Sequence, residues 1–450
     1  PLLRGLALAP LPALAAVIYL TSSRGGVATA LFGTASFLVL TTRRWSALAA
    51  ASIAAVGSIG AVAALQERHE LVNEPGRALA ESQGRGAALL IAGLCLLAGI
   101  VWAVGTALLD GRLPRSVVLD RAAAGLVVVA AVVGVAAVQP NQRFEEFKQP
   151  PGEIETESGD FVGAHLVSAN GSGRWQLWES GVEEFETEPL RGRGAGSFEA
   201  WWAERGTIEG FVRDAHSLYV ELLGELGIAG FLLLVAAFTT AIVAGLRRTV
   251  GAADQASRAT RAALLAGFLA FALGAGIDWM WELTAVAVVG IALLGLLTGP
   301  ATARPVSRES EPRRRWPLLA LPAALALVGL LVVVAQAIPL VASMKIQDSQ
   351  AAIARGDATA ALDAALDAKS IQPWAASPYL QLALVEAELD DPRSAHRWIE
   401  DAIERDPGDW RLWVTRARIE TSLGRVSAAR RSIERARALN PRSTLFAGAG

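Results

Sequence analysis

Cysteine and charge are both scarce in this sequence. Cys95 is the single cysteine and lies in an apolar run, so no intrachain disulfide can form and cysteine usage does not report the redox compartment. Only 19% of the 450 residues are charged, whereas 53% are hydrophobic, which excludes an ordinary soluble globule. The formal net charge of −2 gives no electrostatic reason to expect a nucleic-acid partner, and none is predicted.

A starting Met and the charged n-region of a signal peptide are also missing. The chain begins at Pro1, in the middle of an apolar segment. It is therefore expected to be an N-terminally truncated piece of a longer membrane protein.

Long apolar runs recur along the first three quarters of the chain. Each has roughly the 16–25 residues that cross the hydrocarbon core of a bilayer as a helix. The expected spans lie near residues 5–21, 26–41, 46–65, 87–109, 120–139, 216–246, 262–277, 282–299 and 317–340. The sequence thus predicts an all-α, polytopic membrane protein with about nine spans. Charges inside these runs are nearly absent, which argues against a transporter or flippase with ionisable sites near the midplane.

Arginine clusters between the spans indicate the orientation. With nine spans, clusters such as Arg43–Arg44 and Arg313–Arg315 all fall on one side, which the positive-inside rule makes cytoplasmic. The opposite side receives Arg24, the long loop 140–215, His216, Asp278 and everything after the ninth span. The predicted localisation is the inner (cytoplasmic) membrane, with this loop and the carboxy-terminal part extracytoplasmic.

The tail repeats with a fixed period. Pro373, Pro407 and Pro441 are spaced by 34 residues, and several alanines keep the same step. Helix pairs repeating every 34 residues, with small residues at the crossings and Pro at the repeat end, are typical of tetratricopeptide (TPR) repeats. We therefore expect a membrane domain at 1–341 and TPR-like helical repeats at 342–450, which offer a concave face to a protein partner.

The outer loop becomes aromatic, basic and Gly-rich in "SGRWQLWESGVEEFETEPLRGRGAGSFEAWW". A loop this long is expected to fold over the membrane surface. Trp201 and Trp202 are expected to be anchors at headgroup level. The alternate glycines of "GRGAGSF" (192–198) would let backbone N–H groups approach a phosphate. However, the strand-then-helix context and the Lys-Ser/Thr of a P-loop are missing, so a flexible turn is favoured.

Two polar residues at the outer ends of spans are candidate site residues. Arg24 lies in a very short outer turn, where it either snorkels to a lipid phosphate or holds an anionic headgroup bidentately. His216, one of four histidines, is either a general base near neutral pH or a helix-start residue bonded to the backbone. Asp214 is expected to cap the following helix.

These segments together resemble the O-antigen ligase family. The resemblance rests on "TSSRGG", "GRWQLW", "PLRGRGAGSF", "AHSLYVELLGELGIAGFLLL" and "GIDWMWELTAVAVVGIALLGLL", in that order, and covers roughly residues 1–300. It implies a metal-independent membrane glycosyltransferase without cofactor. Such an enzyme moves a glycan from an undecaprenyl-diphosphate carrier to a hydroxyl of a glycan, lipid or protein acceptor outside the cytoplasmic membrane, in surface polysaccharide assembly.

The resemblance also implies roles for single residues. Arg24 and Arg174 match the family's arginines near the carrier diphosphate, and His216 matches the histidine proposed to deprotonate the acceptor. Arg213 is added because its position before the helix start faces the expected site. The family usually has Asn after this histidine, whereas this chain has Ser217, which leaves the placement of the acceptor open.

Two alternatives stay open. A polymerase that joins carrier-linked repeat units uses similar parts, and only the appended repeat domain favours a ligase. A non-catalytic membrane anchor that presents the TPR-like domain explains residues 342–450 but leaves Arg24, Arg174 and His216 without a common role.

Overall fold

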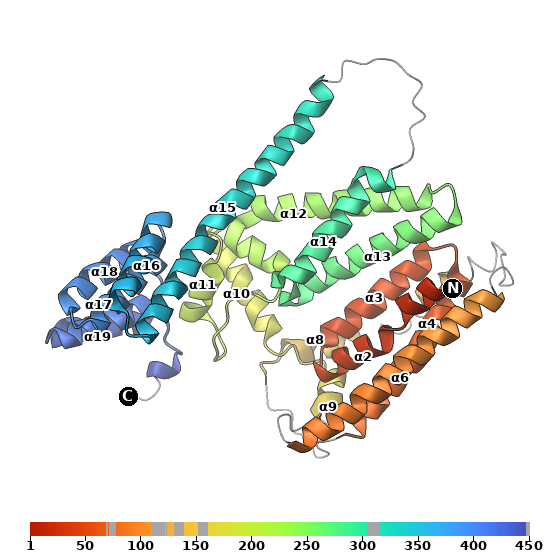
Figure 1. Ribbon diagram of the computed structural model, residues 1–450, viewed down its shortest axis with the longest axis horizontal. Coiled ribbons are helices and arrows are strands. Elements are labelled where there is room, and N and C mark those ends of the chain that lie inside the picture. The colour runs from red at the N-terminus through yellow and green to blue at the C-terminus, as the bar shows by residue number, and fades with distance from the viewer. Residues whose placement is uncertain are drawn as a thin grey trace. The chain divides into compact units, whose positions relative to one another are not determined.

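The computed structural model describes residues 1–68, 71, 78–109, 122, 124–129, 139–151, 161–303 and 316–446. In these ranges every regular element is a helix and no strand occurs (Figure 1). The all-α prediction is therefore confirmed for this part of the chain. The span expected at 120–139 lies mostly outside the described residues.

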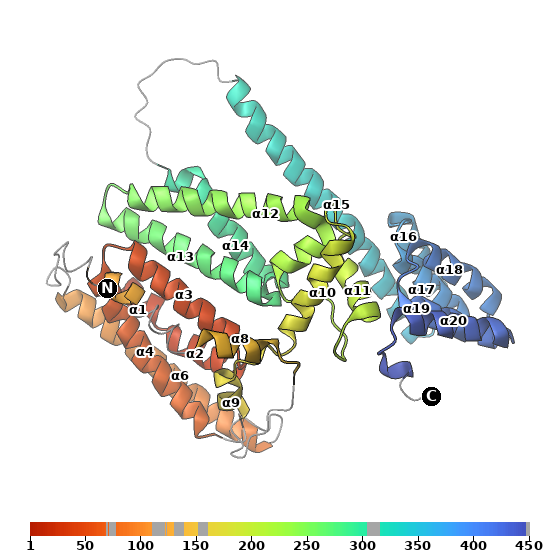
Figure 2. The ribbon, with the colours of Figure 1, turned by 180° about the vertical axis from the view of Figure 1, so that it is seen from behind.

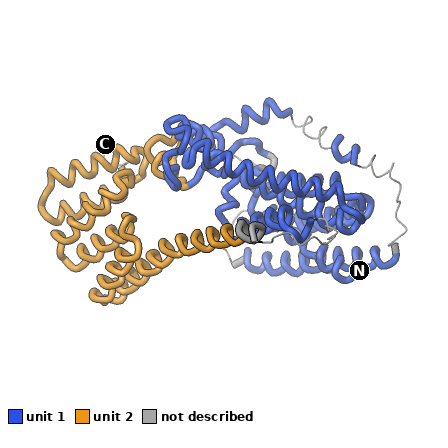
Figure 3. Tube along the Cα trace, turned by 90° about the horizontal axis from the view of Figure 1, so that it is seen from above, with its two compact units in different colours: residues 1–198, 214–305 blue, residues 199–213, 306–450 orange. Residues whose placement is uncertain are grey.

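The chain divides into two compact units, which Figure 3 shows in different colours. The first unit comprises residues 1–198 and 214–305, and the second comprises 199–213 and 306–450. The boundary expected at residue 342 lies inside one continuous helix, α15 (Trp316–Ala354). The end of the outer loop, residues 199–213, is packed as part of the second unit.

The first unit is built of apolar helices and the short helices of the outer loop. Its elements are α1 (Leu2–Leu8), α2 (Leu11–Leu20), α3 (Arg24–Leu40), α4 (Arg44–Gln66), α6 (Ala78–Leu109), α8 (Pro140–Lys148), α9 (Phe161–Val167), α10 (Arg174–Thr187), α12 (Leu218–Val250), α13 (Gln255–Ile277), η1 (Trp279–Glu282), α14 (Thr284–Thr298) and η2 (Pro300–Thr302). Helix α11 (Ser197–Arg205) begins in the first unit and continues into the second.

Six segments of the described chain are long and apolar enough to cross a membrane. They are Leu2–Leu20, Arg44–Gln66, Ala80–Leu108, Leu218–Val250, Gln255–Ile277 and Ala323–Ala354. The spans expected at 26–41 and 282–299 coincide with two shorter apolar helices, Arg24–Leu40 and Thr284–Thr298. Many large apolar side chains of these helices are exposed, as expected for helices that face lipid. The chain is therefore consistent with a polytopic membrane protein, and the count of nine spans stays a prediction.

The helices α3, α12, α13 and α14 carry the outer ends that matter for the site. Figures 1 and 2 show α12 and α13 running alongside each other, with α3 against α13. Their apolar core includes Leu265, Phe268 and Leu297, each at most 1% exposed. At the end that carries the site, the Tyr219 hydroxyl donates to the carbonyl of Ala272 at 2.7 Å and ties the start of α12 to α13.

Gly227 interrupts α12 near its start. Its backbone has φ 64° and ψ −167°, a conformation that essentially only glycine adopts. A Cβ built at this position would lie 2.6 Å from the backbone nitrogens of Arg191 and Gly192. The expected single helix at 216–246 is therefore two helices joined at Gly227, because another segment passes directly against the backbone there.

The segment that passes Gly227 is the Gly-rich part of the outer loop. Four backbone hydrogen bonds join it to α12: Ile228 N to Pro189 O (2.8 Å), Ala229 N to Leu190 O (3.4 Å), Arg193 N to Gly224 O (3.1 Å) and Gly194 N to Glu225 O (2.9 Å). Two of the N–H groups that a phosphate would need are thus bonded to carbonyls of α12. Gly192 serves a close approach between backbones, since a Cβ there would lie 2.3 Å from the Glu225 carbonyl, whereas Gly194 and Gly196 serve the turn through their positive φ.

Two buried carboxyl groups hold the turn that follows. The Ser197 hydroxyl donates to Oε1 of Glu184 at 2.7 Å, and the Phe198 N–H to Oε1 of Glu225 at 3.4 Å. Glu184 is fully buried, and its Oε2 has no hydrogen-bond partner among the described residues. Burial, more than the neighbouring Glu225 charge, raises the pKa of Glu184 to about 7. This carboxyl group is therefore largely protonated in mildly acidic solution.

The second unit continues from α15 into pairs of helices. They are α16 (Ala358–Ile371), α17 (Ala376–Glu388), α18 (Pro392–Arg405), α19 (Trp410–Ser422) and α20 (Val426–Leu439), followed by η3 (Thr444–Phe446). The starts of α16, α18 and α20 are 34 residues apart, as are those of α17 and α19. Small residues such as Ala395 and Ala402 are fully buried where the helices cross. The assignment of these helices to the TPR family stays a prediction.

Candidate functional site

Arg24 lies at the start of α3, where the outer loop returns to the membrane helices. Ser23 caps α3 through its hydroxyl, which accepts from the Gly26 N–H. The Arg24 guanidinium donates to the Ser168 carbonyl and to the Ser172 hydroxyl, both at 2.7 Å. Arg24 is therefore held by the loop, which argues against the first of its two predicted roles, a side chain that only snorkels to lipid phosphate.

Ser172 and Gly173 form the turn that places Arg174. Both have left-handed backbones, with φ 51° and 87°, and α10 begins at the next residue. The Nε of Arg174 donates to the Ile277 carbonyl at 3.0 Å, and its Nη2 to Oδ2 of Asp278 at 2.7 Å. A residue of the outer loop is thereby tied to the end of α13, 103 residues later in the chain.

Asp278 pairs with Arg174 and lies close to the start of α3. Its Oδ2 lies 3.4 Å from the position of a Cβ on Gly25, next to Arg24, while it pairs with Arg174. Arg24 and Arg174 also repel each other, and both act on His165 of α9. Burial and then these two charges lower the pKa of His165. The two guanidinium groups form an electropositive pair, with Asp278 bonded to Arg174 and the charge of Glu146 acting on Arg24, and such a pair can attract an anion.

His216 stands in a strained turn just before α12. Its φ is 53°, the left-handed region that non-glycine residues rarely occupy and that clusters at functional sites. Its Nδ1 lies 2.8 Å from Oδ1 of Asp214, which also accepts the His216 N–H at 3.0 Å. The Ser217 hydroxyl, not Asp214, caps α12 by accepting from the Val220 N–H. The expectation that Asp214 caps this helix is therefore wrong: its carboxylate turns back onto the histidine two residues later.

The charge state of His216 reflects this pairing. Burial alone lowers the pKa of the imidazole, but the hydrogen bonds and the charge of Asp214 outweigh burial, and the net pKa is raised. The charge of Arg174 also acts on His216, in the opposite direction. The structure thus brings Arg24, Arg174 and His216 into one electrostatically connected site, built from the starts of α3, α10 and α12.

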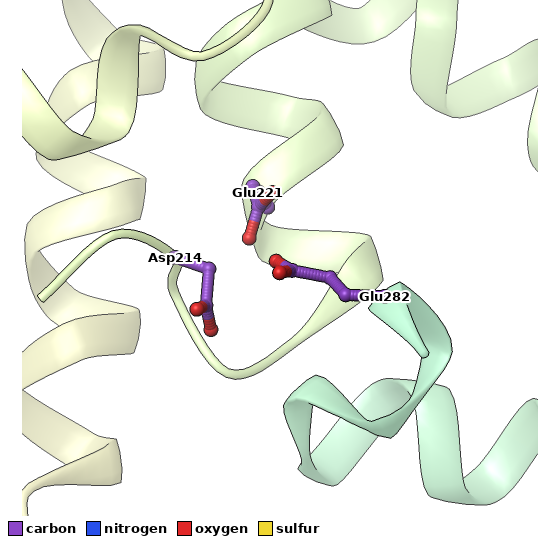
Figure 4. A group of neighbouring side chains, drawn as sticks. All are labelled: Asp214, Glu221 and Glu282. Atoms are coloured by element: carbon purple, nitrogen blue, oxygen red, sulfur yellow. The ribbon is translucent and has the colours of Figure 1, made fainter. Parts of the chain in front are cut away.

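Three carboxyl groups gather beside His216. Asp214, Glu221 and Glu282 each place an oxygen within 4.8 Å of the others (Figure 4). Asp214 and Glu221 are buried, whereas Glu282 is exposed. Oxygens at this spacing can share a proton or hold a divalent cation. Two of the groups already have structural roles, because Glu221 accepts the Ala215 N–H at 3.0 Å and Asp214 accepts from His216.

Residues 76–235 match the family model described as O-antigen ligase. The match supports membership of the O-antigen ligase family and membrane glycosyl transfer in polysaccharide assembly. No curated protein matches the chain. The matched residues include Arg174, Arg213 and His216, while Arg24 and Asp278 lie outside the match and join the site through the fold.

Arg213 and the two adjacent tryptophans fall in the second unit. The Nε of Arg213 lies 3.7 Å from Glu199, and the Arg213 side chain is 75% exposed. Trp201 and Trp202 are only 3% and 2% exposed. The expectation that they anchor at headgroup level is wrong, because their rings are buried in protein.

Several site residues were not singled out from the sequence. Asp278 was placed on the outer side, but its pairing with Arg174 depends on a long-range contact. Glu221 and Glu282 carried no local signal, since one lies in an apolar helix and the other in an aromatic turn. The pairing of Asp214 with His216 had one signal in the sequence, which is the two-residue spacing between them.

Proposed function

We propose that this protein is a membrane glycosyltransferase that moves a glycan from an undecaprenyl-diphosphate carrier to an acceptor hydroxyl outside the cytoplasmic membrane. The observation that carries the proposal is the joint placement of a carboxylate-paired histidine before α12, Arg24 at the start of α3, and Arg174 bonded to the end of α13. The histidine is suited to remove a proton, and the two arginines are suited to bind a diphosphate. The outer loop and the repeats then lie on the extracytoplasmic side.

His216 takes the role of general base. Because Asp214 occupies Nδ1, the other ring nitrogen, Nε2, is the one that accepts the proton of the acceptor hydroxyl. The acceptor oxygen then bonds to the anomeric carbon of the glycan, and the bond from that carbon to the diphosphate oxygen breaks. The imidazolium that forms is stabilised by the Asp214 carboxylate and later releases its proton to solvent.

Arg24 and Arg174 act on the leaving group. Negative charge grows on the diphosphate as the bond breaks, so two guanidinium groups stabilise the transition state more than the bound substrate. Asp278 and the Ile277 carbonyl hold the Arg174 guanidinium, and Ser168 and Ser172 hold that of Arg24. The site is thereby pre-organised for an anion. Arg213 is a further candidate contact to the carrier.

We place the reaction with ligases, which use an acceptor other than a second carrier-linked glycan. The appended repeats favour this assignment, because a docking surface suits an acceptor or a protein partner. A polymerase of carrier-linked units is the second candidate. Both reactions free the donor's carrier diphosphate and differ in the other product: a polymerase lengthens a glycan on a second carrier, whereas a ligase labels a different molecule.

The test uses membranes that contain the protein, a carrier-linked glycan and no added metal. We expect release of carrier diphosphate by the wild type and its loss in His216→Ala and Arg24→Ala, with membrane insertion unchanged. Arg85→Ala is a matched control, because Arg85 forms an exposed ion pair with Glu81. Normal transfer by both site variants would overturn the assignment of these residues. No release by the wild type or by either variant, across a range of glycan donors, would favour a non-catalytic anchor.

A further inference from the structure

The second unit includes a piece of the outer loop. Residues 199–213 cluster with 306–450, although more than 90 residues separate the two parts in the sequence (Figure 3). This piece ends one residue before Asp214 and three before His216. The contacts that hold it therefore bear directly on the backbone that enters the candidate site.

Arg411 of α19 makes the central contact. Its Nη2 lies 2.6 Å from Oε1 of Glu199 in α11. The same guanidinium lies 5.2 Å from the Phe211 ring and 3.6 Å from Oδ1 of Asp409. Glu199 in turn lies 3.7 Å from Arg213. One arginine of the repeats thus contacts both ends of the loop segment.

Arg442 makes the second contact. Its Nη2 donates to the carbonyls of Trp202 and Ala203, at 2.8 and 3.1 Å, at the end of α11. Near these residues Trp410 packs edge-on against Phe446, with ring centroids 6.2 Å apart. Burial lowers the pKa of Arg442 and raises that of Asp409. Both shifts indicate that these polar groups lie in a partly dehydrated contact.

We propose that the surface of the repeats around Arg411 and Arg442 is a binding site for the chain's own segment 199–213, and that it positions His216. The repeats therefore have a ligand in cis, a segment that begins as a helix, carries Glu199 paired with Arg411, and has two buried tryptophans. Arg411 and Arg442 are positioning residues: they contact the segment and act on His216 through the backbone. The positioning role rests on the proposed function, whereas the docking does not.

The test compares the full-length Arg411→Ala/Arg442→Ala variant with the wild type in detergent and in membranes. Arg205 is a built-in reporter, because trypsin can cleave after it and its side chain is half exposed. We expect cleavage after Arg205 to be about tenfold faster in the variant, since cleavage follows the open population of the segment. We also expect kcat of transfer to fall about tenfold with KM for the carrier-linked glycan nearly unchanged.

Two further variants make the result specific. Arg430→Ala removes an exposed arginine of α20 that pairs with Glu434, and both rates should match the wild type. Arg411→Lys keeps a charge that can pair with Glu199, and it should restore most of kcat in an otherwise wild-type chain. This rescue would not occur if the loss merely reflected unfolding of the repeats.

The outcomes are distinguishable. Unchanged cleavage in the double variant would overturn the docking. Faster cleavage with unchanged kcat would overturn the positioning of His216. A wild type without any transfer would count against the proposed function, and the cleavage rates alone would then decide for or against the docking.

Discussion

His216 Nδ1 and Asp214 Oδ1 lie 2.8 Å apart, in a turn where the histidine backbone has a positive φ. The carboxylate therefore fixes both the ring and the N–H of the same residue. The pairing thus orients the imidazole ring within a turn whose histidine has a left-handed backbone.

Asp214→Asn should shift the pH dependence of transfer. The pKa of His216 is raised because Asp214 outweighs burial; without the carboxylate, burial lowers it. A base must be neutral to act, so the acid limb of kcat against pH should move to lower pH. The maximal kcat should also fall about 10- to 100-fold, because ring orientation and imidazolium stabilisation are lost. Asp254→Asn, at the cap of α13, is the control and should change neither quantity.

Arg174→Lys should behave unlike a conservative change. Lysine keeps the charge but lacks the planar fork whose two nitrogens, Nε and Nη2, bond the Ile277 carbonyl and Asp278. We expect about a tenfold loss of kcat, measured as carrier diphosphate released per minute. Arg85→Lys alters an exposed pair with Glu81 and should leave the rate unchanged. Equal rates for Arg174→Lys and wild type would show that charge alone suffices at this position.

Glu184→Gln should make stability less dependent on pH. The folded-state pKa of Glu184 is about 7, above the ordinary 4.5, so folded protein binds the proton more tightly than unfolded protein. Its contribution is therefore favourable at low pH and is lost as pH rises from 4.5 through 7, by at most about 3 kcal/mol. The variant should have a higher Tm than wild type at pH 9 and a similar one at pH 5. Its exposed neighbour Glu183, changed to Gln, provides the comparison.

Gly227→Ala should destabilise the first unit. The alanine adopts a positive φ only with strain, and its Cβ would meet the backbone of the loop at 2.6 Å. We expect a loss of at least about 2 kcal/mol, seen as a lower Tm in detergent. Gly93→Ala is matched in chemistry but lies in open space in the middle of α6, and it should be neutral. A Tm unchanged by Gly227→Ala would mean that the loop does not press on this backbone.

Chelation should leave transfer intact. Asp214 and Glu221 bond to the turn that holds His216, so their carboxylates have a role without a cation. We expect the same rate with a chelator as with added Mg²⁺ or Mn²⁺. A rate that disappears with the chelator and returns with one of these ions would assign the three carboxyl groups to a metal instead.

The sequence predicts the helical class and the separate site residues better than it predicts their contacts. Arg24 and His216 could be selected because each is a polar residue near the end of an apolar run, and Arg174 because the family resemblance implies it. Their partners could not, because Ser168, Ser172 and Asp278 meet the arginines only after the loop folds back across the helix ends. Asp214 and Ser217 are both suited by residue type to cap α12. The left-handed backbone at His216 lies between them, and Ser217 is the residue that caps the helix.

The errors have a similar physical origin. Trp201 and Trp202 look like interface anchors because nothing local shows that residues 199–213 pack with the repeats. Gly227 looks like an ordinary member of a long apolar helix, since the break comes from a loop that approaches it from 35 residues upstream. In both cases tertiary packing overrides a pattern that is sound for an isolated segment.

The break at Gly227 also determines which part of α12 has to match the thickness of the bilayer. Helix α12 has 33 residues, which at a rise of 1.5 Å per residue is about 50 Å, well beyond a hydrocarbon core of about 30 Å. Residues 228–250 alone extend about 34 Å and suffice for one crossing. The part of α12 before the break is therefore not needed to cross the bilayer. Its position is set by its hydrogen bonds to the loop backbone at 189–194. Membranes of different thickness would then tilt or compress the helix below Gly227, while the distance from His216 to the two arginines stays a property of the protein.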